Sequence, residues 1–172
     1  YPFDASEESL RRIQGWFNGK HSAWRQLSRM FREDLFVTNC CAETMQDAMD
    51  LVRMILLKRG YADHSIFFDL ECSSKLCISI SGNGIAFVKT RYTYGEKSFC
   101  GVFQFEKPVR YHGINMHLLF VLSVGSSEPR EFLAFNGWVE ALLQDRQPLF
   151  MPKETLSYQQ LLDRLHTYFI YH

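Results

Sequence analysis

A chain of 172 residues with 47% hydrophobic and 15% aromatic residues can form one folded domain, and this composition excludes a disordered protein. Its 19 basic and 19 acidic residues give a formal net charge of +0, so charge does not indicate a surface for nucleic acid or membrane lipids. No apolar run could span a bilayer, and the first residues lack the form of a signal peptide. Because the chain opens at Tyr1, we expect a fragment of a longer protein, and cysteines without a pairing pattern predict that this protein is cytoplasmic.

The cysteines give no sign of a metal site or a disulfide framework. There are five of them, an odd number, and none is in the CxxC spacing that zinc sites use. Two are adjacent, which is poor geometry for a mutual disulfide. We therefore predict reduced thiols, no metal and no cofactor. The cysteines are Cys40, Cys41, Cys72, Cys77 and Cys100.

Residues 1–33 predict a helical lead-in, separate in character from a domain over residues 34–172. Ser6-Glu7-Glu8 precedes an amphipathic pattern, Asn18-Gly19 predicts a break, and a second helical stripe begins at Trp24. The lead-in could link to an upstream domain or pack on the domain that follows, and the sequence leaves both open.

The next elements predict a strand followed by a capped helix. Leu35–Thr38 reads as a short strand. Thr44, with Asp47 three residues on, predicts the start of a helix, and Gly60 predicts its end. Residues 62–72 predict a further short helix.

Two apolar runs then meet at Gly82-Asn83-Gly84, within the stretch Ile78–Arg91. Glycines on both sides of an asparagine permit positive φ and a close approach of the backbone. The loop could be a plain turn or a nest of backbone amides that holds an anion.

The remaining pattern alternates strands and helices. Ser98–Phe105 predicts a strand, His112-Gly113 a turn, and the apolar run Met116–Val124 a buried central strand. A helix is expected from Glu128-Pro129 to Leu143, and Ser157 with Gln160 predicts a capping box at the start of the last helix. This order predicts an α/β fold with a mixed central β-sheet flanked by helices.

The order and spacing of these elements resemble the IIA domain of the fructose/mannitol class of the bacterial sugar phosphotransferase system. The resemblance covers roughly residues 34–170, and its most recognisable block is Gly82–Ala86. Further segments that resemble the family are Leu35–Asn39, Ala42-Glu43-Thr44, Gly60-Tyr61, Gly101–Val109, Met116–Ser123 and Ala141-Leu142.

The resemblance also implies that the family's chemistry has been lost. In the family, the glycine block leads through a proline to a phosphate-accepting histidine, and a second histidine assists. Here Val88 stands at the position of the proline, Lys89 at that of the phosphate-accepting histidine and Glu131 at that of the assisting histidine. Ser73-Ser74 replaces an Arg-Glu pair of the family. A lysine side chain is protonated near neutral pH and is not a nucleophile. We expect Lys89 and Glu131 to form a salt bridge in place of the histidine pair.

Three functions follow from this resemblance. The first is a IIA-like regulatory or interaction domain that transfers no phosphate, the C-terminal part of a transcriptional regulator or antiterminator linked to the phosphotransferase system. Its partners would be phosphotransferase proteins or other domains of the same regulator, with no direct contact to nucleic acid and no membrane insertion. The second is a working phosphocarrier that uses His112 or His117, although His117 fits a structural histidine better. The third is a module that binds an anion or a protein at Gly82, Asn83, Gly84, Lys89 and Glu131. His166 is expected on the surface.

Overall fold

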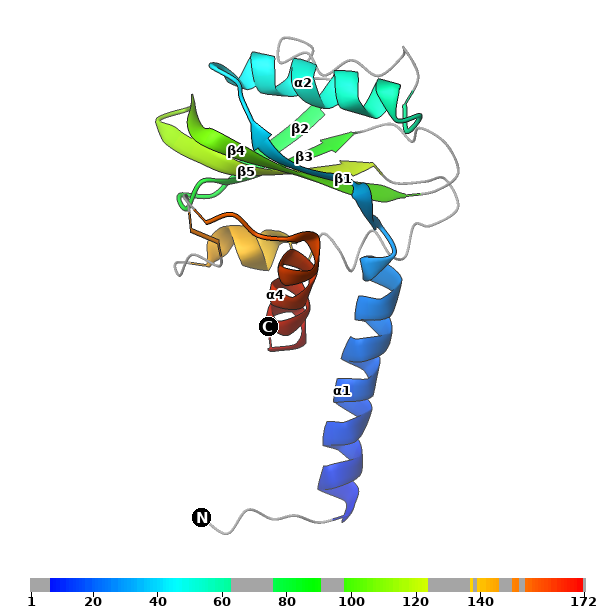
Figure 1. Ribbon diagram of the computed structural model, residues 1–172. Helices are drawn as coiled ribbons and strands as arrows, with labels where there is room; N and C mark the ends of the chain where they lie inside the picture. The colour runs from blue at the N-terminus through cyan, green and yellow to red at the C-terminus, as the bar shows by residue number, and fades with distance from the viewer. Residues whose placement is uncertain are drawn as a thin grey trace.

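The computed structural model describes residues 7–62, 76–90, 98–123, 137, 139–145, 150–151 and 154–171. Five strands form one mixed sheet in the order β1-β4-β5-β3-β2, with α2 on one face and α1 and α4 on the other (Figure 1). The α/β fold predicted from the sequence is therefore confirmed. The elements are α1 (Glu7–Ser28), β1 (Phe31–Cys40), α2 (Met45–Lys58), β2 (Leu76–Ile80), β3 (Ile85–Thr90), β4 (Phe99–Tyr111), β5 (Ile114–Ser123) and α4 (Tyr158–Tyr171).

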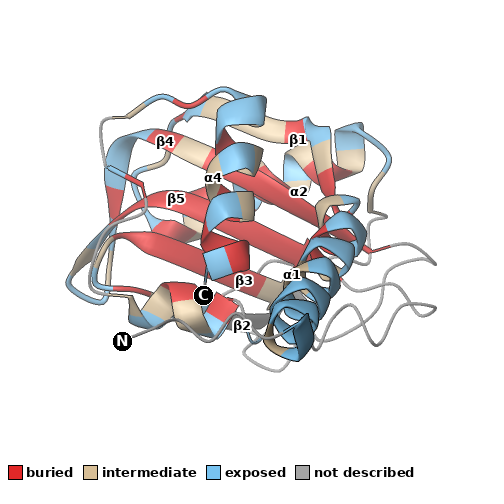
Figure 2. Cartoon of the chain, turned by 90° about the horizontal axis from the view of Figure 1, so that it is seen from below, coloured by how far each residue is buried: buried red, intermediate tan, exposed pale blue. Residues whose placement is uncertain are grey.

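Parallel and antiparallel pairings alternate across the sheet. β1 runs parallel to β4, and β3 runs parallel to β5. The central β4 and β5 form an antiparallel hairpin, and β2 and β3 form a second one at the edge. The strands at the centre are buried along most of their length (Figure 2), which explains the unbroken apolar run of β5.

The start of α2 is fixed by a capping box at Thr44, the residue that the sequence predicts as the helix start. The Asp47 amide donates to Thr44 Oγ1 at 3.1 Å, and the Thr44 amide donates to Asp47 Oδ2 at 3.3 Å. Gly60 follows the helix with a φ of 78°, a conformation that suits glycine. One stripe of α2 is buried against the sheet, and its residues are Met45, Ala48, Met49, Val52 and Leu56.

The opposite face of the sheet is covered by α4 and the C-terminal part of α1. The capping box predicted at the start of α4 is present, because the Gln160 amide donates to Ser157 Oγ at 3.2 Å and the Ser157 amide donates to Gln160 Oε1 at 2.9 Å. Side chains of both helices share one hydrophobic cluster with β3 and β5. They include Trp24, Leu27, Leu161, Leu165 and Phe169.

The helical lead-in differs from the prediction, since α1 runs without a break through Asn18-Gly19. A glycine inside a helix costs only about 1 kcal/mol, which the rest of a 22-residue helix can offset. The strand that follows begins at Phe31, four residues before the predicted Leu35. The domain boundary between residues 33 and 34 remains a prediction.

The strand predicted as Ser98–Phe105 is also longer than expected. β4 continues through Pro108 to the turn at His112-Gly113, and its register with β5 shifts between Gln104 and Val109. Such a bulge lets a proline lie within a strand. Most of the helix predicted over residues 62–72, and the predicted helix start at Glu128-Pro129, lie outside the described residues. The helix expected to reach Leu143 is present over residues 139–144.

Candidate functional site

The glycine block predicted from the sequence forms the turn between β2 and β3. The Ser81 amide donates to the Ile85 carbonyl at 2.9 Å, and the Gly84 amide donates to the Ser81 carbonyl at 3.1 Å. The buried hydroxyl of Ser81 adds a long hydrogen bond of 3.4 Å from the Ile85 amide. The turn is therefore closed by its own backbone.

Gly84 lies directly against the start of β5. Its carbonyl accepts hydrogen bonds from the amides of His117 at 2.8 Å and Leu118 at 3.3 Å, so two residues of β5 oppose one residue of the turn, as in a β-bulge. Its φ is 83°, and a Cβ atom placed on it would lie 2.4 Å from the Asn115 carbonyl oxygen. No other residue fits here without movement of the backbone.

His117 is buried and fastens the turn to β5. Its Nε2 lies 3.1 Å from the carbonyl oxygen of Asn83. A carbonyl oxygen only accepts, so Nε2 carries the proton and donates. Burial lowers the pKa of His117, and the hydrogen bond to Asn83 opposes this in part. Burial thus favours the neutral imidazole, and the hydrogen bond to Asn83 fits the structural role expected of a histidine on a central strand.

The side chain of Asn83 ties the same turn to a third part of the fold. Its Nδ2 donates to the Asp145 carbonyl at 2.9 Å, just after the helical residues 139–144. From α4, Tyr168 reaches the same region and donates to the Ala141 carbonyl at 3.2 Å. Burial first, and then the hydrogen bond and charge of the Asp145 carboxylate, raise the pKa of Tyr168 to about 12. The turn is therefore held from β5 and from the helical segment that α4 contacts.

Sequence reasoning missed Asp145 and Tyr168. Nothing in their local pattern marks them, because tertiary packing alone brings Asp145 to the turn and Tyr168 to Asp145. An anion-binding nest uses N–H donors. Two donors of this turn already have partners in the chain, because the Gly84 amide donates to the Ser81 carbonyl and the Asn83 side-chain amide donates to the Asp145 carbonyl. Anion binding at Gly82–Gly84 remains a prediction.

Lys89 lies near the other end of β3. It pairs with Cys77 of β2 and Leu122 of β5, and its side chain is half-buried. The alternation of side chains along β3 places it on the sheet face covered by α1 and α4. Five residues of extended chain separate it from Gly84, about 16 Å. The structure therefore brings Gly82, Asn83 and Gly84 together but leaves Lys89 apart from them.

Glu131 lies outside the described residues, so its salt bridge with Lys89 remains a prediction. Within the described part of the chain, no group of three or more His, Cys, Asp or Glu side chains could hold a metal ion. Nor do the described helices include one that is long and apolar enough to cross a bilayer.

Two other histidines, His112 and His166, lie away from the β2–β3 turn. His112 lies in the exposed β4–β5 turn with a φ of 48°, against the ring of Tyr111. His166 was expected on the surface, and the structure places it half-buried where α4 packs on α1. Its ring stacks on Trp24 of α1 with 5.1 Å between centroids and 7° between planes, and its Nε2 is buried. The packing of α1 on α4, which the sequence leaves open, accounts for the difference.

No family model matches the chain, and no match was found among curated protein sequences. Solved structures do match. The nitrogen regulatory protein IIA-Ntr from Neisseria meningitidis superposes with a TM-score of 0.64 at 16% identity, over 80% of this chain and 97% of that one. The mannitol-specific cryptic phosphotransferase enzyme IIA CmtB from Escherichia coli superposes with a TM-score of 0.58 at 20% identity, over 82% and 98%. The chain therefore has the fold of the IIA domains of the sugar phosphotransferase system.

Proposed function

We propose that the chain is a IIA-like regulatory or interaction domain that has lost the phosphate-accepting histidine. Its setting would be the C-terminal part of a cytoplasmic transcriptional regulator or antiterminator linked to the phosphotransferase system. The observation that carries this proposal is the combination of a IIA fold with a lysine, Lys89, at the place on β3 where the resemblance puts the nucleophile.

The chemistry of the phosphoryl group supports this view. A phosphate-accepting residue near pH 7 needs a neutral nitrogen lone pair, which an imidazole has and a protonated amine lacks. The β3 sequence Ile-Ala-Phe-Val-Lys-Thr contains no histidine. A domain that keeps the frame of a phosphocarrier without its nucleophile can still present the same surface to partners.

The alternative, a phosphocarrier that uses a displaced histidine, depends on His112 or His117. His117 uses Nε2 to hold the turn, so phosphate transfer through this nitrogen would require the turn to open. His112 is exposed and is the more accessible of the two.

The test is incubation of the chain with phosphoenolpyruvate and the two general phosphotransferase proteins. Intact mass spectrometry should show no added phosphoryl group, while an active IIA domain in the same mixture is modified. Stoichiometric, acid-labile phosphate on a histidine would overturn the proposal. If phosphate were found, a variant with His112→Ala and His117→Ala would decide the alternative, since loss of labelling would support it and full labelling would remove it.

A regulatory module should also bind without being modified. Titration of the isotope-labelled chain with the general phosphocarrier protein, followed by amide chemical shifts, tests this contact. Shifts gathered around β3 and its neighbours would support a retained partner surface. The absence of any shift at millimolar carrier would favour interaction with other domains of the regulator instead.

A further inference from the structure

An apolar stripe runs along α1, and nothing in the described structure covers the part of it in the N-terminal half of the helix. Positions three and four residues apart along α1 form one face, and the residues of this face are Leu10, Ile13, Phe17, Lys20, Trp24 and Leu27. Near the sheet, Trp24 and Leu27 are buried. Toward the N-terminal end of α1, Leu10 and Ile13 are 50% and 43% exposed, and the neighbouring Trp16 is 50% exposed.

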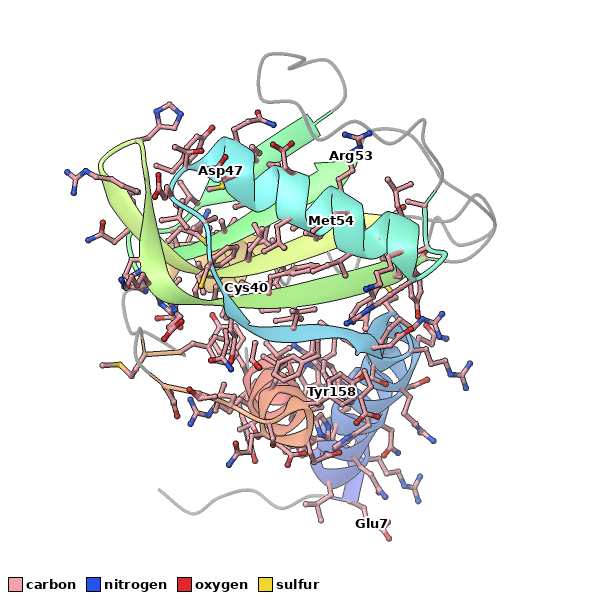
Figure 3. All side chains as sticks on the ribbon, turned by 45° about the horizontal axis from the view of Figure 1, so that its top comes forward. Glu7, Cys40, Asp47, Arg53, Met54 and Tyr158 are labelled. Atoms are coloured by element: carbon pink, nitrogen blue, oxygen red, sulfur yellow. The ribbon has the colours of Figure 1, made fainter. Side chains whose placement is uncertain are left out.

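The stripe changes from buried to exposed because α4 is shorter than α1. α4 runs antiparallel to α1, since Trp24 stacks on His166 while Lys20 contacts Phe169, closer to the end of α4. Lys20 Nζ donates to the Phe169 carbonyl at 3.4 Å, and α4 ends two residues later. Beyond this level, Glu7–Trp16 projects about 15 Å away from the rest of the domain (Figures 1 and 3).

We propose that a second copy of the chain covers this stripe, with the two α1 helices packed antiparallel about a two-fold axis near Ile13. In this arrangement Leu10 of each copy packs against the partner's Trp16, and the two Ile13 side chains meet on the axis. The contact is isologous, so it closes as a dimer and leaves no further copy of the patch exposed.

The direction of α4 supports this occupant. A second α1 that lies antiparallel to the first runs in the same direction as α4 and begins where α4 ends. The helix N-terminus of the partner's α1 therefore meets the C-terminal carbonyls of α4, and the two helix dipoles line up head to tail. α4 and the partner's α1 together would cover the whole stripe.

Charge also favours the antiparallel arrangement. Glu7 of one copy comes level with Gly19 and Lys20 of the other, so an acid lies beside an amine. A parallel pair would instead place Glu7, which flanks the stripe, level with Glu7 of the other copy. Like charges in these positions would oppose association.

Sedimentation velocity of the 172-residue chain, in reducing buffer because Cys41 is exposed, tests the dimer between about 1 and 200 µM. The patch is small, so we expect a dissociation constant of about 1–100 µM. Ile13→Glu would bury two like charges on the axis and should raise this constant at least about tenfold. The control is Asn18→Glu, on the opposite side of α1 and exposed, which should leave it unchanged. Circular dichroism of both variants checks that the fold is kept.

Orientation is tested by zero-length carbodiimide crosslinking followed by peptide mass spectrometry. Glu7 and Lys20 lie about 20 Å apart along one helix, so a Glu7–Lys20 crosslink forms only between copies. Its presence in the dimer fraction supports the antiparallel pair. A chain that is monomeric at every concentration, a dimer that withstands Ile13→Glu, or a dimer without this crosslink would overturn the proposal. The first outcome would leave the stripe to a different partner.

Discussion

His117 on β5 donates a hydrogen bond from Nε2 to the backbone carbonyl of Asn83, and the two atoms are 3.1 Å apart. The backbone amides of His117 and Leu118 also donate to the Gly84 carbonyl. Together these bonds fasten the β2–β3 turn to the centre of the sheet. The most recognisable block of the sequence is thus a structural junction in the described fold.

Gly84→Ala should destabilise the protein by about 2–4 kcal/mol. The methyl group would meet the Asn115 carbonyl oxygen at 2.4 Å, and alanine disfavours a φ of 83°. Gly82→Ala is the matched control, because a Cβ atom there meets nothing within 4 Å and it should change stability by less than about 1 kcal/mol. Urea unfolding measures both values. Equal effects of the two substitutions would contradict the close approach of Gly84 to β5.

Stability should fall as pH decreases below about 6.5. Burial lowers the pKa of His117 and of His166, so each folded histidine takes up its proton at a lower pH than the same residue in the unfolded chain. Between these two values the unfolded chain binds more protons, and acid therefore favours unfolding.

This pH dependence can be assigned by substitution. His117→Gln and His166→Gln should each flatten the plot of unfolding free energy against pH between 5 and 7, and the double variant should flatten it further. Urea midpoints at several pH values supply the plot, and each variant is compared with its own value at pH 8. A His117→Gln protein with the full original slope would show that this histidine does not titrate at low pH.

Ser157→Ala should lower the free energy of unfolding by about 1 kcal/mol, because it removes the side-chain acceptor for the Gln160 amide at the start of α4. Thr155→Ala, two residues earlier and also exposed, is the control and should have little effect. Thermal or urea unfolding gives the difference. A larger effect at Thr155 than at Ser157 would be inconsistent with the capping box.

Cys41 should react with a small alkylating reagent in the native protein, while Cys40 and Cys100 should react only after unfolding. The Cys41 thiol is exposed beside the Glu106 carboxylate. Burial, and then the neighbouring Cys41, raise the pKa of Cys40 to about 11, and complete burial raises the pKa of Cys100 further. Peptide mapping of protein labelled with and without denaturant shows which cysteines react in the native state and which react only after unfolding. Fast native labelling of Cys100 would contradict its place in the core.

Local signals in the sequence predicted the local features well. The helix start at Thr44, the capping box at Ser157, the turn glycines and the apolar central strand depend on residues within a few positions of one another, so their patterns can be recognised without the fold. The break expected at Asn18-Gly19 failed because helix propensity is a weak preference. The strand ends at Phe31 and Tyr111 depend on pairing with distant strands, which no local pattern reports.

The candidate site could be predicted only in part for a similar reason. Gly84 was marked by its residue type, but the atoms that make glycine necessary belong to Asn115 and His117, about thirty residues away. Asp145 reaches the turn, and Tyr168 reaches Asp145, only after the helices have packed. The separation of Lys89 from the glycines follows from β3 being extended, which the resemblance alone did not make evident.

The placement of α4 has a consequence for synthesis of the protein on the ribosome. Ile85, Phe87, Leu118 and Phe120 belong to the hydrophobic cluster that α4 completes with Leu161 and Leu165. These strands leave the ribosome dozens of residues before α4 does, so the part of this sheet face that α1 does not cover stays exposed during that interval. Nascent chains should therefore need a chaperone at this stage, and a premature stop before Tyr158 should yield aggregates rather than a smaller folded domain.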